Sequence, residues 1–303
     1  MDLDHPLVSV HIVTYNQEAY VARAIEGALQ QQTDFAVEIV VGEDCSQDGT
    51  RDIVWRYQRE HPERMRVITS DHNVGALENS NRVLGVCRGK YIAICDGDDY
   101  WTDPCKLQKQ VDFLEAHPEY GMCCHDVDVV CDGVARFCTF AEPPSGVFSF
   151  EDAVKRHFIP TPSLVWRHEL MTAIPLWLKG CVSVDLFLEL LLLDRKPGYY
   201  VHETMAVKVD NAGSVCRTPQ ARDETACLRR MYRKMDLVTE GRHREILRWK
   251  IAQLSLKLAG ENLKLKRFSP FLKYTLDGLR SDPAVVWAVV RRRLRALLGA
   301  YPQ

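Results

Sequence analysis

Short apolar runs alternate with amphipathic segments between residues 7 and 95, and this alternation restricts the fold more than any other feature of the chain. The runs typical of β-strands are residues 7–13, 35–41, 65–69 and 91–95. The segments between them place apolar residues at helical spacing, over 17–32, 50–60 and 79–87. This order predicts an α/β, Rossmann-like fold, with a mostly parallel sheet and helices on both faces.

Polar clusters follow three of these strands, at residues 14–16, 43–50 and 96–99. In open α/β sheets, ligands bind at the carboxyl ends of the strands. The last cluster holds Asp96, Asp98 and Asp99, whose charges repel one another unless a cation lies among them. Mg²⁺ and Mn²⁺ take oxygen ligands, and nucleotide phosphates usually complete their shell. The sequence therefore predicts a metal–diphosphate site here, with an Asp-rich turn as the alternative.

The remainder of the chain is less regular. It favours helices over 106–115, 150–157 and 186–194, with Asp185 at the start of the last one, and strands over 127–130 and 164–167. From about residue 224 the pattern is helical to the end, with breaks near Ser269-Pro270 and Ser281-Asp282-Pro283.

Charge is divided unevenly along the 303 residues, whose formal net charge is −2. Residues 242–303 hold 14 Lys and Arg against 4 Asp and Glu, whereas residues 1–241 hold 25 against 37. Motifs that read nucleic acids are missing, so we expect no nucleic acid partner. Residues 284–298 combine an apolar helical face with four arginines, which is typical of peripheral contact with an anionic membrane. The alternative is that this face packs on the protein or on a second subunit.

The eleven cysteines include no Cys-x-x-Cys pair, so we expect reduced thiols and no structural zinc. No apolar run approaches the ~18–20 residues of a membrane span. The acidic N-terminus lacks the layout of a secretion signal. These features predict a cytoplasmic protein, with contact at the inner face of the cell membrane if residues 284–298 dock there.

Four motifs, taken in order and with their spacing, resemble the family-2 nucleotide-sugar glycosyltransferases, which are inverting enzymes of the GT-A fold. The motifs are residues 8–16, residues 43–50, Asn73-Val74-Gly75 and residues 96–99, and the resemblance covers roughly residues 7–215. It implies a GT-A glycosyltransferase domain over residues 1–218 and leaves residues 219–303 as a C-terminal helical extension.

The resemblance also implies roles for single residues. The nucleotide would be bound by Thr14, Tyr15, Asn16, Glu43, Asp44, Asp96 and Gly97. Asp98, together with Asp96, would ligate Mg²⁺ or Mn²⁺. An acidic side chain at Glu43 or Asp44 can accept a hydrogen bond from a uracil or thymine ring N–H, and the donor that we expect is a UDP-sugar. Thr161 and Ser163 resemble the acceptor side, and Asn211 and Ser214 a loop over the diphosphate.

Inverting transfer also needs a base that deprotonates the acceptor hydroxyl. Asp185 resembles the family's catalytic acid and follows Asp98 by 87 residues. A carboxylate at a helix N-terminus can also be a plain cap, and His125 and Asp126 are rival bases.

These features predict an inverting glycosyltransferase, assisted by a divalent metal, that moves a sugar from a nucleoside-diphosphate sugar to a glycan or lipid-linked acceptor, as in lipopolysaccharide or capsule synthesis. One alternative is a catalytically inactive nucleotide-sugar binding module. The other is a nucleotidyltransferase on a similar sheet, although residues 13–23 lack the Gly-rich basic loop that binds a triphosphate. A dinucleotide dehydrogenase is excluded, because no Gly-x-Gly-x-x-Gly follows the first strand.

Overall fold

The computed structural model describes residues 5–131, 134–136, 141–181, 183–210 and 224–298. The chain forms two compact units. One comprises residues 1–179 and 184–214 and holds the sheet, and the other comprises residues 180–183 and 215–303 and holds the last four helices.

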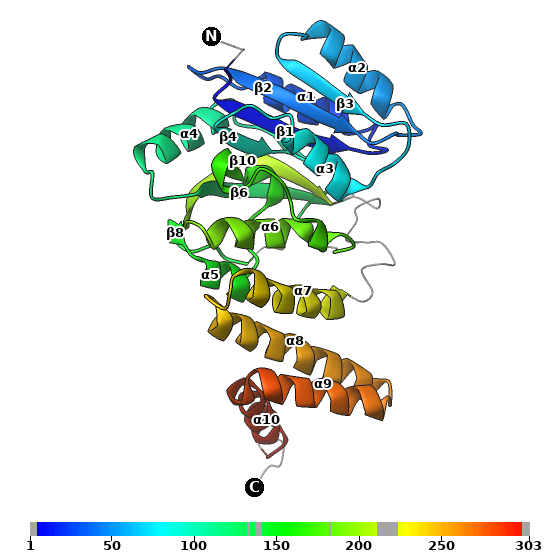
Figure 1. Ribbon diagram of the computed structural model, residues 1–303, viewed down its shortest axis with the longest axis vertical. Helices are drawn as coiled ribbons and strands as arrows, with labels where there is room; N and C mark the ends of the chain where they lie inside the picture. Colours follow the sequence, from blue (N-terminus) through cyan, green and yellow to red (C-terminus); the bar gives the residue numbers. More distant parts are fainter. Residues whose placement is uncertain (1–4, 132–133, 137–140, 182, 211–223, 299–303) are drawn as a thin grey trace. The chain divides into compact units, whose positions relative to one another are not determined.

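The amino-terminal half of the sheet has the predicted parallel order (Figure 1). Neighbouring strands run β3-β2-β1-β4, and their bounds are β1 Val8–Thr14, β2 Val37–Glu43, β3 Met65–Thr69 and β4 Tyr91–Ile94. The connecting helices are α1 Val21–Leu29, α2 Thr50–Glu60 and α3 Ala76–Leu84. In the register of this half, Thr14 is opposite Glu43, and Glu43 is opposite Thr69. The carboxyl ends of three strands therefore lie side by side.

Alternate residues of β1 face opposite layers, which explains how one strand supports helices on both faces. Val10 and Ile12 belong to the main apolar core together with Ile25 of α1. His11 points the other way, and its Nε2 lies 2.9 Å from the Ser80 hydroxyl on α3. The period-2 pattern of a strand places its neighbouring side chains on opposite faces, and this confirms the predicted α/β fold with a covered sheet.

Mixed pairing replaces the parallel order in the second half of the sheet, which continues β4-β9-β6-β10-β5. The pairs β4/β9, β9/β6 and β10/β5 are antiparallel, and β6/β10 is parallel. The small strands β7 and β8 pair with β6 and β10. The bounds are β5 Tyr100–Trp101, β6 Met122–Cys131, β7 Val134–Arg136, β8 Val147–Phe148, β9 Val165–Arg167 and β10 Gly198–Asp210.

The longest of these strands, β10, was not predicted from the sequence. Its middle holds the exposed residues His202, Glu203 and Thr204, and its pairing with β6 shifts register on both sides of Thr204. A bulge of this kind interrupts the apolar–polar alternation by which a strand is recognised. The helices of this half are α4 Lys106–Ala116, α5 Phe150–Lys155 and α6 Val184–Leu193.

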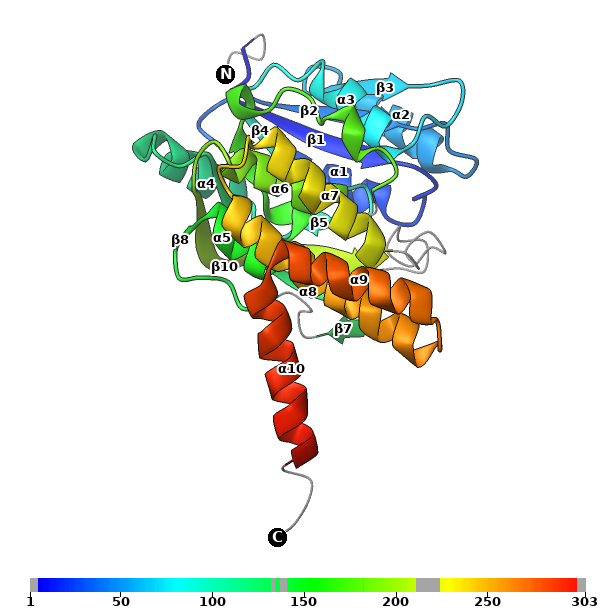
Figure 2. The same cartoon turned by 60° about the horizontal axis from the view of Figure 1, so that its bottom comes forward.

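The second unit consists of the helices α7 Glu224–Val238, α8 Arg244–Lys264, α9 Phe268–Ser281 and α10 Pro283–Leu298 (Figure 2). Both predicted breaks are present, although the first lies at residues 265–267, between α8 and α9 and a few residues before Pro270. Pro270 lies in the first turn, where proline costs no intrahelical hydrogen bond. The chain turns instead at Lys266, whose φ is 57°. Of the helices described here, none has the length and apolar character that a membrane crossing requires.

Candidate active site

The three predicted polar clusters meet at one edge of the sheet. The Asp44 N–H donates to the Thr14 carbonyl oxygen at 3.1 Å, and the Gly97 N–H donates to the Val13 carbonyl oxygen at 2.9 Å. Gly97 has no room for a side chain, since a Cβ there would lie 2.4 Å from Gln17 Oε1 and 2.8 Å from the Thr14 side chain. Glycine at this position is what lets the aspartate loop approach the end of β1.

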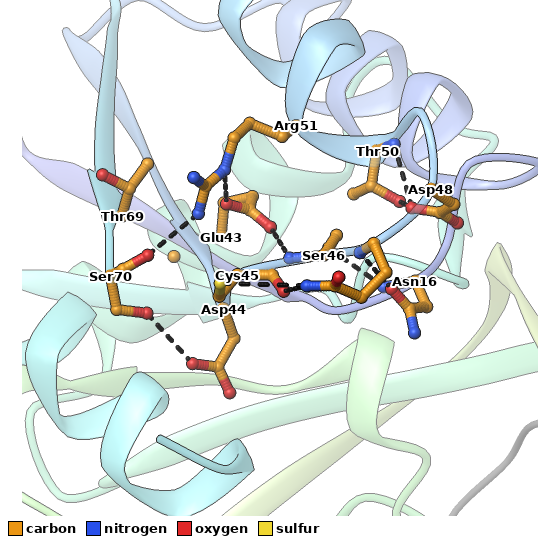
Figure 3. A network of polar contacts seen from close by, with 12 residues as sticks. Asn16, Glu43, Asp44, Cys45, Ser46, Asp48, Thr50, Arg51, Thr69 and Ser70 are labelled. Atoms are coloured by element: carbon orange, nitrogen blue, oxygen red, sulfur yellow. Dashed lines mark hydrogen bonds and ion pairs between the residues drawn. The ribbon is translucent and has the colours of Figure 1, made fainter. Parts of the chain in front are cut away.

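The loops after β1 and β2 hold each other through side chains (Figure 3). The Asn16 N–H donates to Ser46 Oγ at 3.0 Å, and the Gln47 N–H donates to Asn16 Oδ1 at 2.8 Å. Asn16 and Cys45 both have positive φ, 51° and 60°. Non-glycine residues in this region are uncommon and persist only where the surroundings hold them. Beside them, Tyr15 leaves 43% of its surface exposed, so its ring is available to a ligand.

Glu43 is fully buried, and both of its oxygens already have partners (Figure 3). One oxygen accepts from the Ser46 N–H at 2.6 Å, and the other accepts from Arg51 Nε at 2.5 Å. Arg51 also donates to the Ser70 carbonyl oxygen at 2.9 Å. The hydrogen bond from the Arg51 guanidinium offsets part of the cost of burying this side chain. Glu43 therefore shapes the loop after β2, and its remaining lone pairs are what it could offer a nucleotide.

Asp44 is also buried and organises the third motif of the predicted set. Its Oδ1 accepts from the Val74 N–H at 2.8 Å and from Ser70 Oγ at 3.3 Å, and its Oδ2 accepts from the Gly75 N–H at 2.9 Å. Gly75 has a φ of 88°, which glycine adopts without strain, and it lies directly before α3. The motif at residues 73–75 is thus the backbone partner of Asp44.

The aspartate cluster faces a lysine that sequence reasoning missed. Asp96 and Asp98 are partly exposed, whereas Asp99 is buried. Asp99 Oδ1 accepts from the Val209 N–H at 2.8 Å, and its Oδ2 lies 3.5 Å from Lys208 Nζ. Lys208 is on β10, and 30% of its side chain is exposed. No sequence signal identified it, because β10 itself was not predicted.

The charged groups of this cluster shift one another's pKa values. Burial first, and then the charge of Asp99, raises the pKa of Asp96 to about 7, while Lys208 opposes the rise. Burial likewise raises the pKa of Asp99 to about 6 against the opposing charge of Lys208. Burial disfavours the charged form of Lys208, but Asp99, Asp96 and Asp185 outweigh it and raise the lysine pKa. Neighbouring like charges make ionisation costly, so a bound cation would favour the ionised acids.

Asp185 reaches the same cluster from the first turn of α6. Its Oδ1 accepts from the Leu186 N–H at 2.9 Å, and its Oδ2 accepts from Thr161 Oγ1 at 3.5 Å. Its charge contributes to the raised pKa values of Asp96 and Lys208. Asp98 and Asp185, which the sequence separates by 87 residues, thus both act with their charge on Lys208.

The rival bases are placed differently. His125 is fully buried, and burial holds its pKa well below the ordinary value, so the ring is neutral. Its Nδ1 lies 2.7 Å from the Asp126 carbonyl oxygen. The Asp126 carboxylate accepts from the Tyr200 hydroxyl at 2.9 Å. Neither residue is among the main groups whose charge acts on Asp96 or Lys208, whereas Asp185 is among them for both.

Four further residues were predicted to lie on the acceptor side or in a loop over the diphosphate. Thr161 and Ser163 form a 3₁₀ turn. Thr161 contacts Asp185, whereas Ser163 is fully buried and its hydroxyl donates to the Pro160 carbonyl oxygen at 2.6 Å. Ser163 thus stabilises the turn that places Thr161. Asn211 and Ser214 lie outside the described residues.

Glu189 is a second residue that the sequence did not single out. It lies one helical turn after Asp185 and is 1% exposed. Neither of its oxygens has a hydrogen-bond partner among the residues that the structure describes. Burial first, and then the charge of Asp185, holds the pKa of Glu189 well above its ordinary value. The His157 ring lies close by, with its Nε2 4.0 Å from Glu189 Oε1. A buried carboxyl group that accepts no hydrogen bond is more stable in the neutral form than as an ion.

We expect Glu189→Gln to stabilise the protein at alkaline pH. The folded state keeps the Glu189 proton at pH values where the unfolded chain has lost it, so the free energy of unfolding falls as pH rises above the ordinary glutamate pKa. At pH 8 the variant should melt a few degrees above the wild type, since about 1 kcal/mol moves the midpoint by roughly 2–4 °C. The difference in melting temperature between the variant and the wild type should become smaller toward pH 4. A pH-independent difference, or the same gain in the exposed control Glu60→Gln, would contradict this reading.

The donor set suits a hard divalent cation. Mg²⁺ is usually held by one or two carboxylates, with phosphates and water completing its shell. Asp96 and Asp98 are partly exposed, and the pKa of Asp96 is raised to about 7, as expected for an acid that gains from a cation beside it. Across the described ranges, no three His, Cys, Asp or Glu side chains are arranged to hold a metal ion on their own. The site thus fits an ion that shares its ligands with a diphosphate.

Comparison with known proteins finds similar sequences over the amino-terminal part of the chain. Residues 9–136 match the family model for glycosyl transferase family 2. An uncharacterized protein of Mycobacterium tuberculosis is 39% identical over 165 residues, which cover 54% of this chain and 47% of that protein. The Escherichia coli enzyme WfaP, a UDP-Glc:alpha-D-GlcNAc-diphosphoundecaprenol beta-1,3-glucosyltransferase, is 33% identical over 141 residues, 46% of this chain and 52% of WfaP. The matched part of the chain thus spans about half the length of these relatives.

Among solved structures, residues 1–349 of S. aureus TarS in complex with UDP-GlcNAc superpose with a TM-score of 0.69 at 18% identity. The match covers 96% of this chain and 86% of that one. At this identity the likeness establishes the fold alone.

Proposed function

Since this chain is a family-2 glycosyltransferase of the GT-A fold, we propose that it transfers a sugar with inversion from a nucleoside-diphosphate sugar, most simply a UDP-sugar, to a hydroxyl of a surface-glycan acceptor. The observation that supports the proposal is that the charges of four acids, Asp185, Asp96, Asp98 and Asp99, all act on Lys208. One group can accept a proton there, and the others can hold a diphosphate through a cation.

The nucleotide would lie at the ends of β1 and β2. Tyr15 offers an exposed ring for stacking, and Thr14, Asn16, Glu43 and Asp44 build the surrounding loops. Asp96 and Gly97 continue this surface toward the diphosphate. The choice of uracil rests on an acidic oxygen accepting from the base ring N–H, for which Glu43 and Asp44 keep spare lone pairs.

Asp185 would act on the acceptor. Its carboxylate takes the proton of the attacking hydroxyl, the hydroxyl oxygen bonds to the anomeric carbon, and the bond from that carbon to the diphosphate oxygen breaks with its electron pair leaving on the nucleoside diphosphate. Attack on the face opposite the leaving group inverts the anomeric centre. Thr161, which donates to Asp185 Oδ2, holds the carboxylate in place for this step.

Asp98 and Asp96 would hold Mg²⁺ or Mn²⁺, which supplies Lewis-acid stabilisation of the leaving diphosphate. Lys208 adds a fixed positive charge within the same cluster. Its position allows it to balance the acids before the donor binds and to attract phosphate oxygens afterwards.

Two other functions fit less well. An inactive nucleotide-sugar binding module would need no base at the cluster, yet Asp185 is electrostatically coupled to it. A nucleotidyltransferase would need a Gly-rich basic loop after the first strand, and residues 14–20 contain neither glycine nor lysine. The site favours glycosyl transfer.

The setting of the reaction also belongs to the proposal. The acceptor is a glycan or lipid-linked glycan of the cell envelope, the enzyme acts in the cytoplasm, residues 1–218 form the catalytic domain, and residues 219–303 are an extension. Two findings support this part of the proposal. The name of the relative WfaP includes a lipid-linked acceptor, and residues 215–303 belong to a compact unit other than the one that holds the sheet. Residues 284–298 remain a candidate for contact with the membrane.

A donor screen tests the proposal. The full chain is incubated with UDP-, GDP- and dTDP-sugars, with Mn²⁺ or Mg²⁺ or with chelator, and release of the nucleoside diphosphate is measured with and without a polyprenyl-diphosphate glycan. We expect release from one UDP-sugar that requires the metal and rises with acceptor. Binding of a donor without release under any condition would favour the inactive module, and release of pyrophosphate from a nucleoside triphosphate would favour the nucleotidyltransferase.

A further inference from the structure

Helix α9 carries a row of exposed apolar side chains. Phe268, Leu272 and Leu276 follow one another at four-residue intervals and expose 68%, 58% and 43% of their surface, and Leu265, just before the helix, exposes 62%. Residues at this spacing lie on one face of a helix. We call Leu265, Phe268, Leu272 and Leu276 the α9 stripe.

The other face of α9 is already packed within its unit, where the helix lies beside α8 (Figure 2). Gly278 is buried, with Val286 of α10 and the carbonyl oxygen of Ala252 of α8 around it. On this half of the helix, Asp277 accepts from Arg229 of α7 at 2.9 Å. One face of α9 is therefore packed against its neighbouring helices, whereas the α9 stripe is exposed. A helix of this kind normally has a partner on each apolar face.

Cations surround the α9 stripe. Five basic residues between 264 and 281 are exposed, namely Lys264, Lys266, Arg267, Lys273 and Arg280. Among the described residues none of the five forms an ion pair, and the single acid of this segment, Asp277, is paired with Arg229 and Arg233. Within the described residues of this unit, the surface around the stripe therefore carries positive charge without ion-pair partners.

We propose that the α9 stripe and its cations dock the protein on an anionic lipid bilayer. An apolar row flanked by Lys and Arg matches the two layers of a membrane interface, because the apolar side chains enter the acyl boundary while the cations meet the headgroups. Symmetric pairing of two copies through this face would place the same cations against one another. A neutral or cationic surface would leave them without counter-charges.

This contact goes beyond the proposed function and differs from the sequence expectation for residues 284–298. On α10, Trp287 and Val290 are exposed, but Val286 faces α8 and α9. Among the side chains that the structure describes in the second unit, the larger exposed apolar row is on α9. Vesicle binding needs neither donor nor acceptor, so it succeeds or fails independently of glycosyl transfer.

The test is flotation of the full chain with phosphatidylcholine vesicles, with and without phosphatidylglycerol, over a range of salt. The stripe variant is Phe268→Ser/Leu272→Ser/Leu276→Ser. The matched control is Leu237→Ser on α7, since this leucine is 72% exposed and lies outside the stripe. Trp287→Ser tests α10. Circular dichroism checks that each variant is folded, and sedimentation velocity gives the oligomeric state.

We expect binding that requires the anionic lipid, weakens with salt, falls by roughly tenfold or more in the stripe variant and is unchanged in Leu237→Ser. Absence of wild-type binding at low salt would overturn the proposal. So would wild-type-like binding by the stripe variant, or loss of binding confined to Trp287→Ser, which would assign the contact to α10. Oligomers that the stripe variant alone dissociates, without vesicle binding, would show that the face joins copies of this chain.

Discussion

Replacing Asp185 by Asn should lower the turnover of glycosyl transfer by roughly 10²–10⁴-fold, the usual contribution of a general base. An amide has nearly the shape of the carboxylate and can still accept from the Leu186 N–H and from Thr161, so the start of α6 should be preserved. What it lacks is the basicity to take the acceptor proton. Donor affinity should stay close to that of the wild type, since Asp185 acts on the acceptor.

Two measurements distinguish loss of the general base from a change in the structure of the variant. Calorimetry with UDP and Mn²⁺ reports donor binding, and initial rates at saturating donor report turnover. Asp128→Asn, which removes an exposed acid from β6, is the matched control and should leave both unchanged. If Asp185→Asn kept full turnover but lost donor affinity, the acid would belong to the donor site, and the assignment as base would be wrong.

Asp98→Asn should nearly abolish transfer and its dependence on metal. Loss of an outer partner of a metal ligand typically costs 10–100-fold, so loss of a charged ligand should cost at least ~10²-fold. The fold should survive, because Asp98 is a partly exposed loop residue after β4 and not part of the apolar core. Calorimetry should show the affinity for UDP with Mn²⁺ reduced in parallel with the rate.

Lys208 is an alternative source of positive charge for the diphosphate, and the Asp98→Asn variant distinguishes it from a metal. If the lysine, 3.5 Å from Asp99, supplied all the positive charge that the diphosphate needs, Asp98→Asn would keep its activity. Full transfer by the variant in chelator-treated buffer would therefore show that Lys208 stabilises the diphosphate without a metal, and the metal would be removed from the proposal. The exposed acid Asp52 on α2 provides the control Asp52→Asn, which should behave as the wild type.

The amino-terminal half of the fold could be predicted because its information is local. Buried parallel strands are continuous apolar runs, the helices between them have a period of 3.6, and a parallel crossover forces the two to alternate. The bounds of β3 and α2 were predicted to the residue. The positions of the polar clusters followed from the same rule, since parallel strands bring their carboxyl ends to one edge.

The sequence alone thus determined the α/β sheet, the family and the acids at the strand ends, because each is encoded within a few neighbouring residues. Tertiary structure decided the rest. Lys208 meets Asp99 only because β10 joins the sheet from 109 positions away, and its bulged pattern gave no local sign. Glu43 looked free to bind a ligand, yet Arg51 and Ser46 already hold it. Burial and charge pairing depend on which distant segments pack together, so the ionisation of Asp96, Asp99 and Glu189 could not be inferred from their neighbours in the chain.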